Sequence, residues 1–399
     1  MPLALVAAPA PPPVPEQPDG AAAVLRAALQ SGPLARTAIS RETGLSPAAV
    51  SRHSAELLAL GLVHEPPAPQ GPPRPGRPSV PLDIDTGYHL AVGVHIAIPQ
   101  LTYSLTDLRG RVVAHESAPR RSAPEEVLRD IAAHLPGLLR RHAAGRSVLG
   151  LGVVTGGWVD PDSGTVVENS ALGWRDVPVR RLLGPATRLP IHVEGHAGAL
   201  AQAELLFGAA GGGDLVHLFV GNAVDAAITA GGSLLRGRRN GAGGIAHLPV
   251  PGSSAACPCG RSGCLQATVS DRTFARRAVA EGIVPRPEIG LLTAAALRGD
   301  RRALELCRTR LRLIAPAVAL LLDMIGPELL VLTEAVTLAL PELLPTLYQE
   351  IAARTRLSPE QLVRPSSFGA GVLAVAAGAP VLAAVHRDPL ALRTARRRR

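Results

Sequence analysis

The sequence predicts a small helical domain followed by a large α/β domain. Two proline-rich stretches, Pro9–Pro18 and Pro66–Pro81, isolate a segment of about fifty residues from the rest of the chain. Downstream of Leu82, short apolar runs typical of strands alternate with alanine- and leucine-rich stretches of helical spacing. This alternation is the pattern of an α/β fold. The 399 residues, 47% of them hydrophobic, are enough for two or three packed domains.

Three helices are expected within residues 21–81. The first covers residues 21–30, and the second runs from about Leu34 until Gly44 ends it. The third begins at Ser46, whose side chain is a good N-cap. Two short helices joined by a tight turn, with a polar face on the second, are typical of a helix-turn-helix.

The helix-turn-helix pattern predicts contact with the major groove of double-stranded DNA. Arg52 is the strongest candidate for a base or phosphate contact, because guanidinium groups bind both. Six arginines against three glutamates give residues 21–81 a charge of +3, which suits DNA. A small helical bundle without a DNA role is the alternative. The residues of this motif expected to face DNA are Arg36, Ser46, Ala48, Ala49, Ser51, Arg52 and His53.

The proline-rich segment after the third helix contains the sequence Arg-Pro-Gly-Arg-Pro. A proline-stiffened loop that presents Arg74 and Arg77 would fit the minor groove, where negative potential attracts guanidinium groups. These two arginines complete the predicted DNA-binding set as the tip of a wing. A solvated hinge between domains is the alternative for the same composition.

Residues 82–385 carry the alternating strand and helix pattern, between a leader at 1–20 that is expected to be disordered and a basic tail at 386–399. Strands are expected at 89–98, 101–107, 148–154, 191–194 and 215–220, and helical stretches at 125–141, 197–207, 272–281 and 292–325.

The charged residues exclude some functions and favour others. All 41 basic residues are arginine, which excludes a P-loop lysine and a Schiff-base lysine. They outnumber the 32 acidic residues and give a formal charge of +9, which favours a polyanionic partner. Four cysteines are too few for a disulfide-rich secreted scaffold, and no stretch reaches the roughly 18 uninterrupted apolar residues of a membrane helix. We therefore expect a cytoplasmic protein without a membrane partner.

One imidazole and three thiols lie close together in the sequence, at His247, Cys257, Cys259 and Cys264. This set suits tetrahedral zinc, and four protein ligands leave no open position for catalysis, so the zinc is expected to be structural. A disulfide or free thiols are the alternatives, although a Cys-x-Cys disulfide strains the backbone. The fourth cysteine, Cys307, lies in an apolar helical stretch and is expected to be an ordinary buried residue.

Two motifs carry a family resemblance. They are Asn-Gly-Ala-Gly-Gly-Ile-Ala-His at Asn240–His247 and Cys-Pro-Cys-Gly-Arg-Ser-Gly-Cys-Leu-Gln at Cys257–Gln266, preceded by a winged helix-turn-helix that ends in Gly-Arg-Pro. The chain resembles the ROK family of sugar repressors and sugar kinases from about Ala21 to about Ala384. The resemblance implies a winged helix-turn-helix followed by a two-lobed actin-like, hexokinase-like sugar domain.

The phosphate-binding motifs of the kinases in this family are replaced here. The family's first phosphate loop is Asp-x-Gly-Gly-Thr, and this chain has residues 95–99, which begin with His95 and end with Pro99. The second loop is usually rich in glycine, and here Asp225 would repel phosphate. Thr333 and Glu334 replace the Gly-Gly pair beside adenosine. We therefore expect no kinase activity.

The sugar-binding motifs are also altered relative to the family. The catalytic aspartate of Glu-Asn-Asp is replaced by His196, which has no phosphoryl group to transfer without the nucleotide loops. Gly244 and Gln266 replace two glutamates that contact sugar. The candidate ligand-binding residues that remain are Asn169, Glu194 and His247, with His196 added. These residues hold a sugar or sugar phosphate, or they persist only as hydrogen-bonding elements of a folded cleft.

The combined expectation is a DNA-binding transcriptional regulator, a repressor, whose inactive kinase-like domain forms a homodimer or tetramer. A homodimer would bind a palindromic operator, and a sugar-derived effector would change its affinity for DNA. The main alternative is a constitutive DNA-binding protein with a ligand-free scaffold domain. An active sugar kinase is the least favoured alternative.

Overall fold

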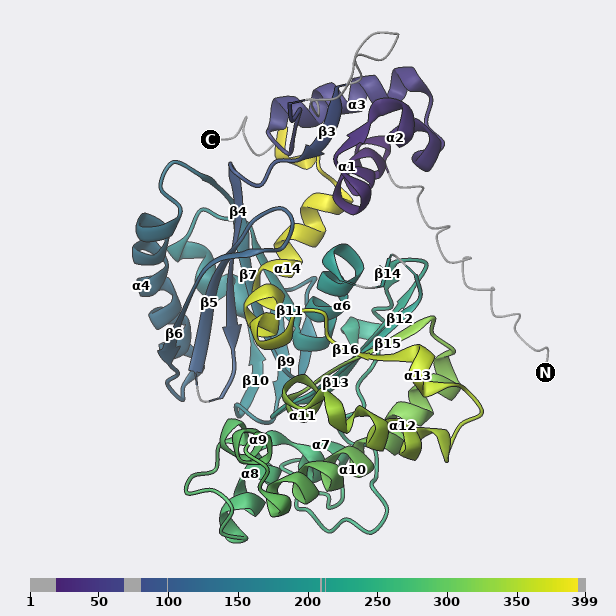
Figure 1. Ribbon diagram of the computed structural model, residues 1–399. Helices are drawn as coiled ribbons and strands as arrows, with labels where there is room; N and C mark the ends of the chain where they lie inside the picture. The colour runs from purple at the N-terminus through teal and green to yellow at the C-terminus, as the bar shows by residue number, and fades with distance from the viewer. Residues whose placement is uncertain (1–18, 68–79, 99, 209, 212, 394–399) are drawn as a thin grey trace, which may run out of the picture. The chain divides into compact units, whose positions relative to one another are not determined.

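The computed structural model describes residues 19–67, 80–98, 100–208, 210–211 and 213–393 (Figure 1). The chain divides into two compact units. The N-terminal unit comprises Met1–Ile84 together with Val385–Arg399, and the large unit comprises Asp85–Ala384. Each unit has its own buried apolar residues.

In its described residues up to Ile84, the N-terminal unit contains three helices and a three-stranded antiparallel sheet. The side chain of Ser46 accepts a hydrogen bond from the backbone N–H of Ala49, as expected of an N-cap. Gly44 and Gly61 end the second and third helices in the left-handed conformation, with φ of 70° and 71°. The elements in chain order are α1 (Gly20–Ser31), β1 (Leu34–Ala35), α2 (Arg36–Thr43), α3 (Pro47–Leu60), β2 (Val63–His64) and β3 (Pro81–Ile84).

Two boundaries in this unit differ from the sequence prediction. Leu34 and Ala35 pair with β3 as strand β1, so the second helix begins only at Arg36. Helix α1 begins at Gly20, inside the stretch expected to be leader. The C-terminal segment also contributes to this unit, because Arg393 Nη1 lies 3.3 Å from Glu56 Oε1 on α3.

The large unit contains two five-stranded sheets. The first has the order β11-β7-β4-β5-β6, in which β4, β7 and β11 are parallel and β5 and β6 are antiparallel. These strands are β4 (His89–Ile96), β5 (Gln100–Thr106), β6 (Val112–Pro119), β7 (Ser147–Thr155) and β11 (Ile191–Gly195). A small sheet joins β8 (Trp158–Asp160), β9 (Thr165–Asn169) and β10 (Trp174–Val177).

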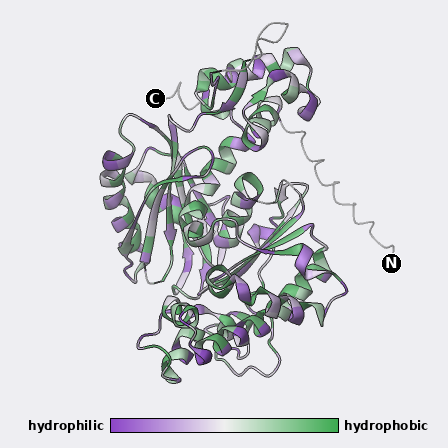
Figure 2. Ribbon diagram, in the orientation of Figure 1, coloured by the Kyte–Doolittle hydropathy of each residue, from purple (hydrophilic) through white to green (hydrophobic). Residues whose placement is uncertain are grey.

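Helix α4 (Pro124–His142) connects β6 to β7, and its apolar side chains pack against one face of the first sheet. Glu125 and Glu126 lie in its first turn, and Arg140, Arg141 and His142 in its last, as the helix dipole favours. Hydrophilic and hydrophobic residues alternate along it (Figure 2). The buried apolar residues are Val127, Leu128, Ile131, Leu135 and Leu138.

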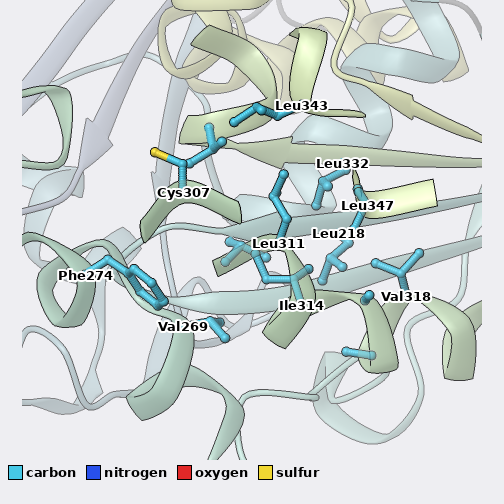
Figure 3. Close-up of a cluster of buried hydrophobic side chains, with 14 of the residues drawn as sticks. Leu218, Val269, Phe274, Cys307, Leu311, Ile314, Val318, Leu332, Leu343 and Leu347 are labelled. Atoms are coloured by element: carbon cyan, nitrogen blue, oxygen red, sulfur yellow. The ribbon is translucent and has the colours of Figure 1, made fainter. Parts of the chain in front are cut away.

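The second sheet has the order β14-β13-β12-β15-β16. Its strands are β12 (Leu215–Val220), β13 (Val224–Ala230), β14 (Ser233–Leu234), β15 (Leu329–Glu334) and β16 (Val363–Pro365). Side chains from this sheet and from helices α8, α10 and α12 meet in one apolar core, in which Leu218, Phe274, Leu311 and Leu332 lie close together (Figure 3). The helices are α5 (Val179–Leu183), α6 (His196–Phe207), α7 (Leu265–Val269), α8 (Asp271–Ala280), α9 (Ile289–Leu297), α10 (Arg301–Ile325), α11 (Ala335–Ala339), α12 (Leu344–Ala352), α13 (Pro359–Leu362) and α14 (Val372–Arg387).

The helical stretch expected at 292–325 is two helices. Gly299 adopts φ of 86° between α9 and α10, and the side chain of Asp300 caps α10 by accepting hydrogen bonds from the N–H groups of Arg302 and Ala303. A left-handed glycine followed by an N-cap ends one helix and starts another.

Helix α14 packs against the first sheet at very short range. A Cβ placed on Gly93 of β4 would lie 2.2 Å from the carbonyl carbon of Ala377, and one on Gly152 of β7 would lie 2.1 Å from the carbonyl oxygen of the same residue. Only glycine permits this approach of helix backbone to sheet. The stretch Gly369–Arg387 is long and apolar enough to cross a membrane, but 67% of it is buried inside the protein.

Candidate functional site

The large unit contains a cavity of about 870 Å³. The loop from β7 to β8, the first turn of α6, strand β13 and the segment Leu234–His247 line it. Several of the predicted ligand-binding residues lie here, including Glu194, His196 and His247. A cavity of this size accommodates a small organic molecule.

Glu194 lies near the end of β11, two residues before α6 begins, and is 2% exposed. Its Oε2 lies 2.6 Å from Nη1 of Arg236, and its Oε1 accepts a hydrogen bond from the N–H of Gly195. Asn240 Nδ2 lies 3.4 Å from the same Oε1. The carboxylate is therefore neutralised by a residue that the sequence analysis did not select, since Arg236 lies 42 residues away along the chain.

Asn169 lies near the cavity, but its side-chain amide already forms hydrogen bonds within the protein. The Nδ2 group donates to the carbonyl oxygen of Gly156 at 2.9 Å, and Oδ1 accepts from the N–H of Leu172 at 3.0 Å. The side chain is 3% exposed. These contacts favour the alternative in which Asn169 holds the loops of the cleft.

His196 lines the cavity from the first residue of α6 and stacks on His95 from the end of β4. The two ring centroids are 4.3 Å apart, and Phe219 meets His196 edge-on at 4.7 Å. Burial lowers the pKa of His95 to about 4 and that of His196 well below its usual range, so both imidazoles are neutral at neutral pH. From the sequence, His95 was expected only to be part of the segment that replaces the first phosphate loop.

Asp225 of β13 also lines the cavity. One carboxylate oxygen accepts a hydrogen bond from the N–H of Gly157 at 3.2 Å. Burial raises the pKa of Asp225 to about 6. The carboxyl group predicted to repel phosphate therefore lies on the wall of the cavity.

The rim of the cavity includes an exposed aromatic ring. Trp158 donates from Nε1 to the carbonyl oxygen of Arg239 at 2.7 Å, and the guanidinium of Arg239 lies 5.7 Å from the centre of the indole. Arg239 and Asn240 adopt positive φ of 51° and 59°. Backbone held in this region costs free energy and is often found at ligand sites.

Gln266 occupies the wall position at which the resemblance implies a sugar-binding glutamate. Its Oε1 accepts from the N–H of Val224 at 3.2 Å, and its Nε2 donates to the hydroxyl of Ser170 at 3.2 Å. Gly244, the replacement of the other glutamate, also lines the cavity and presents no side chain. The two substitutions leave a wall with less negative charge than the family pattern implies.

The structure brings the four predicted metal ligands together. The donor atoms of His247, Cys257, Cys259 and Cys264 all lie within 4.8 Å of one another. Two of the separations are 3.7 Å, between Cys257 Sγ and His247 Nδ1 and between Cys259 Sγ and Cys264 Sγ. A tetrahedron with zinc–sulfur bonds of about 2.3 Å has sulfur–sulfur edges of about 3.8 Å, so the cluster has the size that zinc requires.

The same distances exclude a disulfide within the cluster, because bonded sulfurs lie about 2.05 Å apart. Hydrogen bonds from Arg261 lower the pKa of Cys259 to about 6, which favours the thiolate that binds metal. Cys307 is fully buried in the apolar core, as expected. Arg261 was not selected from the sequence, although it lies between two of the predicted cysteine ligands and could have been identified from that position.

The residues that replace the adenosine-side glycines belong to a buried ion cluster. Glu334 ends β15 with its side chain fully buried, and its Oε1 lies 3.0 Å from Nε of Arg310. Nη2 of Arg310 lies 2.7 Å from Oδ1 of Asp271 and donates to the carbonyl oxygen of Val220. Charged side chains of the protein therefore surround the position at which the resemblance implies a nucleotide.

The N-terminal unit exposes most of the predicted DNA-facing residues. Ser46, Ala48, Ser51 and Arg52 are exposed at the start of α3, and Ala49 is half-buried. His53 is an exception. It is 9% exposed, its Nδ1 lies 2.9 Å from Glu56 Oε2, and its ring packs so close to Gly20 that a Cβ there would lie 2.5 Å from Nε2.

His53 was expected to face DNA because it follows Arg52 in the sequence, and the helical turn instead directs it to the interior. Arg36 lies at the start of α2 and donates to the carbonyl oxygen of Val80, just before β3, while pairing with Glu65. It therefore ties α2 to both ends of the loop between β2 and β3. Arg74 and Arg77 lie outside the described residues.

Comparison with known proteins identifies the family. The ROK family model matches residues 91–384. A transcriptional regulator of Mycobacterium tuberculosis is 32% identical over 93% of this chain and 87% of its own length. The DNA-binding transcriptional dual regulator NagC of Escherichia coli is 26% identical over 82% of each chain.

A solved structure has the same fold over almost the whole chain. It is a ROK family transcriptional regulator, a homologue of the E. coli Mlc protein, with a TM-score of 0.76 and 23% identity, and the match covers 94% of this chain and 97% of that one. The large unit thus has the mixed α/β fold of ROK sugar kinases and regulators. The chain belongs to the ROK family.

Proposed function

We propose that this protein is a DNA-binding transcriptional repressor whose large unit senses a small polar effector and does not phosphorylate it. The observation that carries the proposal is the exposed N-terminal face of α3, with Arg52 beside Ser51 and Ala48. The order helix, strand, helix, helix, then two antiparallel strands is that of a winged helix-turn-helix. Near full-length similarity to proteins named as transcriptional regulators supports it.

The α3 face is suited to the major groove because small side chains surround one arginine. Ser46, Ala48 and Ser51 allow close approach of the helix to base edges, and Arg52 extends beyond them to a guanine or a phosphate. Arg74 and Arg77 would reach the minor groove from the loop between β2 and β3. A homodimer would place two such helices on a palindromic operator, with half-sites one helical turn apart or a multiple of it.

The replaced phosphate-binding motifs support a role without catalysis. Phosphoryl transfer needs positioned phosphates and a base, and here Asp225 occupies a phosphate-loop position while burial lowers the pKa of His196 and makes it a weak base. The cluster at His247 would hold a structural zinc beside the cavity. Effector binding would alter the relative position of the two DNA-binding heads in the dimer and so lower operator affinity.

The test is selection of bound fragments from the source genome by the purified protein at about 150 mM salt, which suppresses nonspecific binding. Arg52→Ala is the variant, and Arg26→Ala, which removes an exposed arginine from α1, is the matched control. We expect one palindromic site to be enriched by the parent and the control and lost in Arg52→Ala. Equal fragment profiles for parent and Arg52→Ala would contradict the proposal.

A second assay tests the absence of catalysis. The protein is incubated with Mg-ATP and a panel of sugars, and ADP release is measured. We expect no release above the rate of a heat-denatured sample. Sugar-dependent release of ADP would favour the active kinase instead.

A further inference from the structure

The second half of helix α10 presents apolar side chains to solvent along one face. Leu320 is 42% exposed and Met324 is 70% exposed. The opposite face of the same helix packs into the apolar core of the large unit (Figure 3). The apolar face of α10 consists of Leu313, Pro316, Leu320 and Met324, each three or four residues after the one before it, so they lie along one side of the helix.

This apolar face is confined to one end of α10. In the first half of the helix the corresponding positions are polar, at Arg302 and Thr309. At the end of α10 and beyond it, Ile325 and Leu357 are 37% and 38% exposed. Four of the twelve large apolar side chains exposed in the described residues are therefore Leu320, Met324, Ile325 and Leu357. Such a concentration of apolar surface is typical of an interaction site.

Charged residues of both signs border the apolar face. Asp323 is exposed one turn after Leu320 and accepts a hydrogen bond from Oγ1 of Thr355 at 2.5 Å. Arg356 is also exposed, and no described residue gives it a carboxylate partner. The remaining cation, Arg354, pairs with Glu350 on α12. These residues border a hollow of about 650 Å³, which is lined by Leu322, Asp323, Gly326, Ala353, Arg354, Thr355, Arg356 and Leu357.

The distribution of charge indicates which partner fits. A nucleic acid is unsuited to this surface, because the apolar face itself offers no cation to a phosphate. A two-fold dimer uses the same patch on both copies, so the patch must be complementary to itself. An apolar centre bordered by one exposed carboxylate and one unpaired guanidinium meets this condition, because a rotated copy brings the opposite charge to each.

We infer that the apolar face of α10 and the adjoining hollow form the contact between two copies of this chain. The two apolar faces cover each other at the centre, where the unbranched side chain of Met324 adapts to the opposing surface. Asp323 of one copy pairs with Arg356 of the partner subunit, and the two-fold axis repeats this pair. The inference rests on the homodimer of the proposed function and specifies the surface that forms it.

The test is sedimentation velocity of the full chain at about 10 µM, since dimerisation depends on concentration. Met324→Arg places a charge in the apolar centre, and Leu297→Arg is the matched control, because Leu297 is 60% exposed at the end of α9, outside the face. We expect the parent and the control to be dimers and Met324→Arg to dimerise at least about tenfold more weakly. Circular dichroism melting checks that all variants fold.

A charge exchange tests the pairing across the two-fold axis. Asp323→Arg alone and Arg356→Asp alone bring like charges together, so each should weaken the dimer at least about threefold. The double variant restores opposite charges and should recover the parent's dimerisation. A double variant weaker than both single variants would reject the ion pairs.

Two results would overturn the inference: a monomeric parent, which would assign the face to a different partner, or equal dimerisation of the parent and Met324→Arg. Operator selection is measured independently. Operator enrichment by a dimer that is insensitive to Met324→Arg would reject this interface and leave the proposed function standing. A dimer that depends on Met324 but enriches no operator would reject the function and leave the interface.

Discussion

Replacing Arg310 by methionine tests whether the buried ion cluster stabilises the large unit. The guanidinium is fully buried and lies 3.0 Å from Glu334 and 2.7 Å from Asp271. Methionine preserves much of the apolar length but leaves Glu334 without its cation. Burial already raises the pKa of Glu334, with Arg310 opposing this shift, so the variant's carboxyl group is expected to fold protonated.

The magnitude follows from the proton that the folded state must then take up. The ordinary pKa of the glutamate is 4.5, so folding with a protonated Glu334 at pH 7 costs about 1.4 kcal/mol for each of 2.5 pH units, or about 3.5 kcal/mol. Loss of a partner from a buried ion pair typically costs about 3–5 kcal/mol, which agrees. Because the pKa is raised in the folded state, this cost is greatest at neutral pH and disappears as the pH falls towards 4.5.

The assay is urea unfolding of the full chain, followed by tryptophan fluorescence. Both tryptophans, Trp158 and Trp174, belong to the large unit, so the signal reports on that unit alone. Because burial already raises the pKa of Glu334 in the parent, we expect Arg310→Met to lower the free energy of unfolding by at most about 3.5 kcal/mol at pH 7, and the gap from the parent to shrink by at most about 1.4 kcal/mol for each unit of acidification.

The double variant Arg310→Met with Glu334→Gln is the matched control, since its amide carries no charge to neutralise. Between pH 7 and 5 its free energy of unfolding should lack the recovery on acidification that is expected of Arg310→Met. A loss below about 1 kcal/mol for Arg310→Met at pH 7, or a gap that stays constant with pH, would refute the reasoning.

Three further outcomes are expected. Cys259→Ser should weaken zinc binding by at least about tenfold in metal titrations, whereas Cys307→Ser, which removes a thiol outside the cluster, should leave it unchanged. Burial lowers the pKa of His217 to about 3, so this residue stays neutral in the folded protein while it protonates below pH 6.5 in the unfolded chain. The protein therefore loses stability on acidification below pH 6.5. In urea unfolding, His217→Gln should reduce the stability lost between pH 7 and pH 5 by about 2 kcal/mol. Gly93→Ala should lower the free energy of unfolding by about 1–3 kcal/mol, because the added Cβ would clash with the backbone of α14. Gly290→Ala is the control and should cause no loss, because a Cβ there has no neighbour within 4 Å. Equal effects of the two variants would refute the packing argument.

The sequence predicted features whose residues lie close together along the chain. The proximity of His247, Cys257, Cys259 and Cys264 was predicted because three cysteines within eight residues and one nearby histidine leave few other arrangements. The third helix was predicted closely for the same reason, since its cap at Ser46 and its end at Gly61 are local. These features depend on residues that are near one another in the sequence, so they can be predicted from a single sequence.

Features that depend on distant residues were not predicted. The pairing of Glu194 with Arg236 and the stacking of His95 on His196 arise because separate strands and helices converge on the cavity. His53 was misassigned because its neighbour Arg52 is exposed, and only the packing against Gly20 shows that its ring is internal. Such contacts depend on the tertiary fold, for which one sequence offers no direct measure.

The altered motifs of the large unit follow one physical pattern. A sugar kinase must leave its phosphate-binding loops open to the nucleotide, and small residues such as glycine in those loops provide the room. In this chain Glu334 and Asp271 near the adenosine side require Arg310 in the interior, and Asp225 faces the cavity with His196. Charged side chains of the protein thus lie at positions where the family pattern implies the charged groups of a nucleotide. On the function proposed above, the cavity would hold a polar ligand without a requirement for ATP, and the binding energy would act on conformation instead of on chemistry.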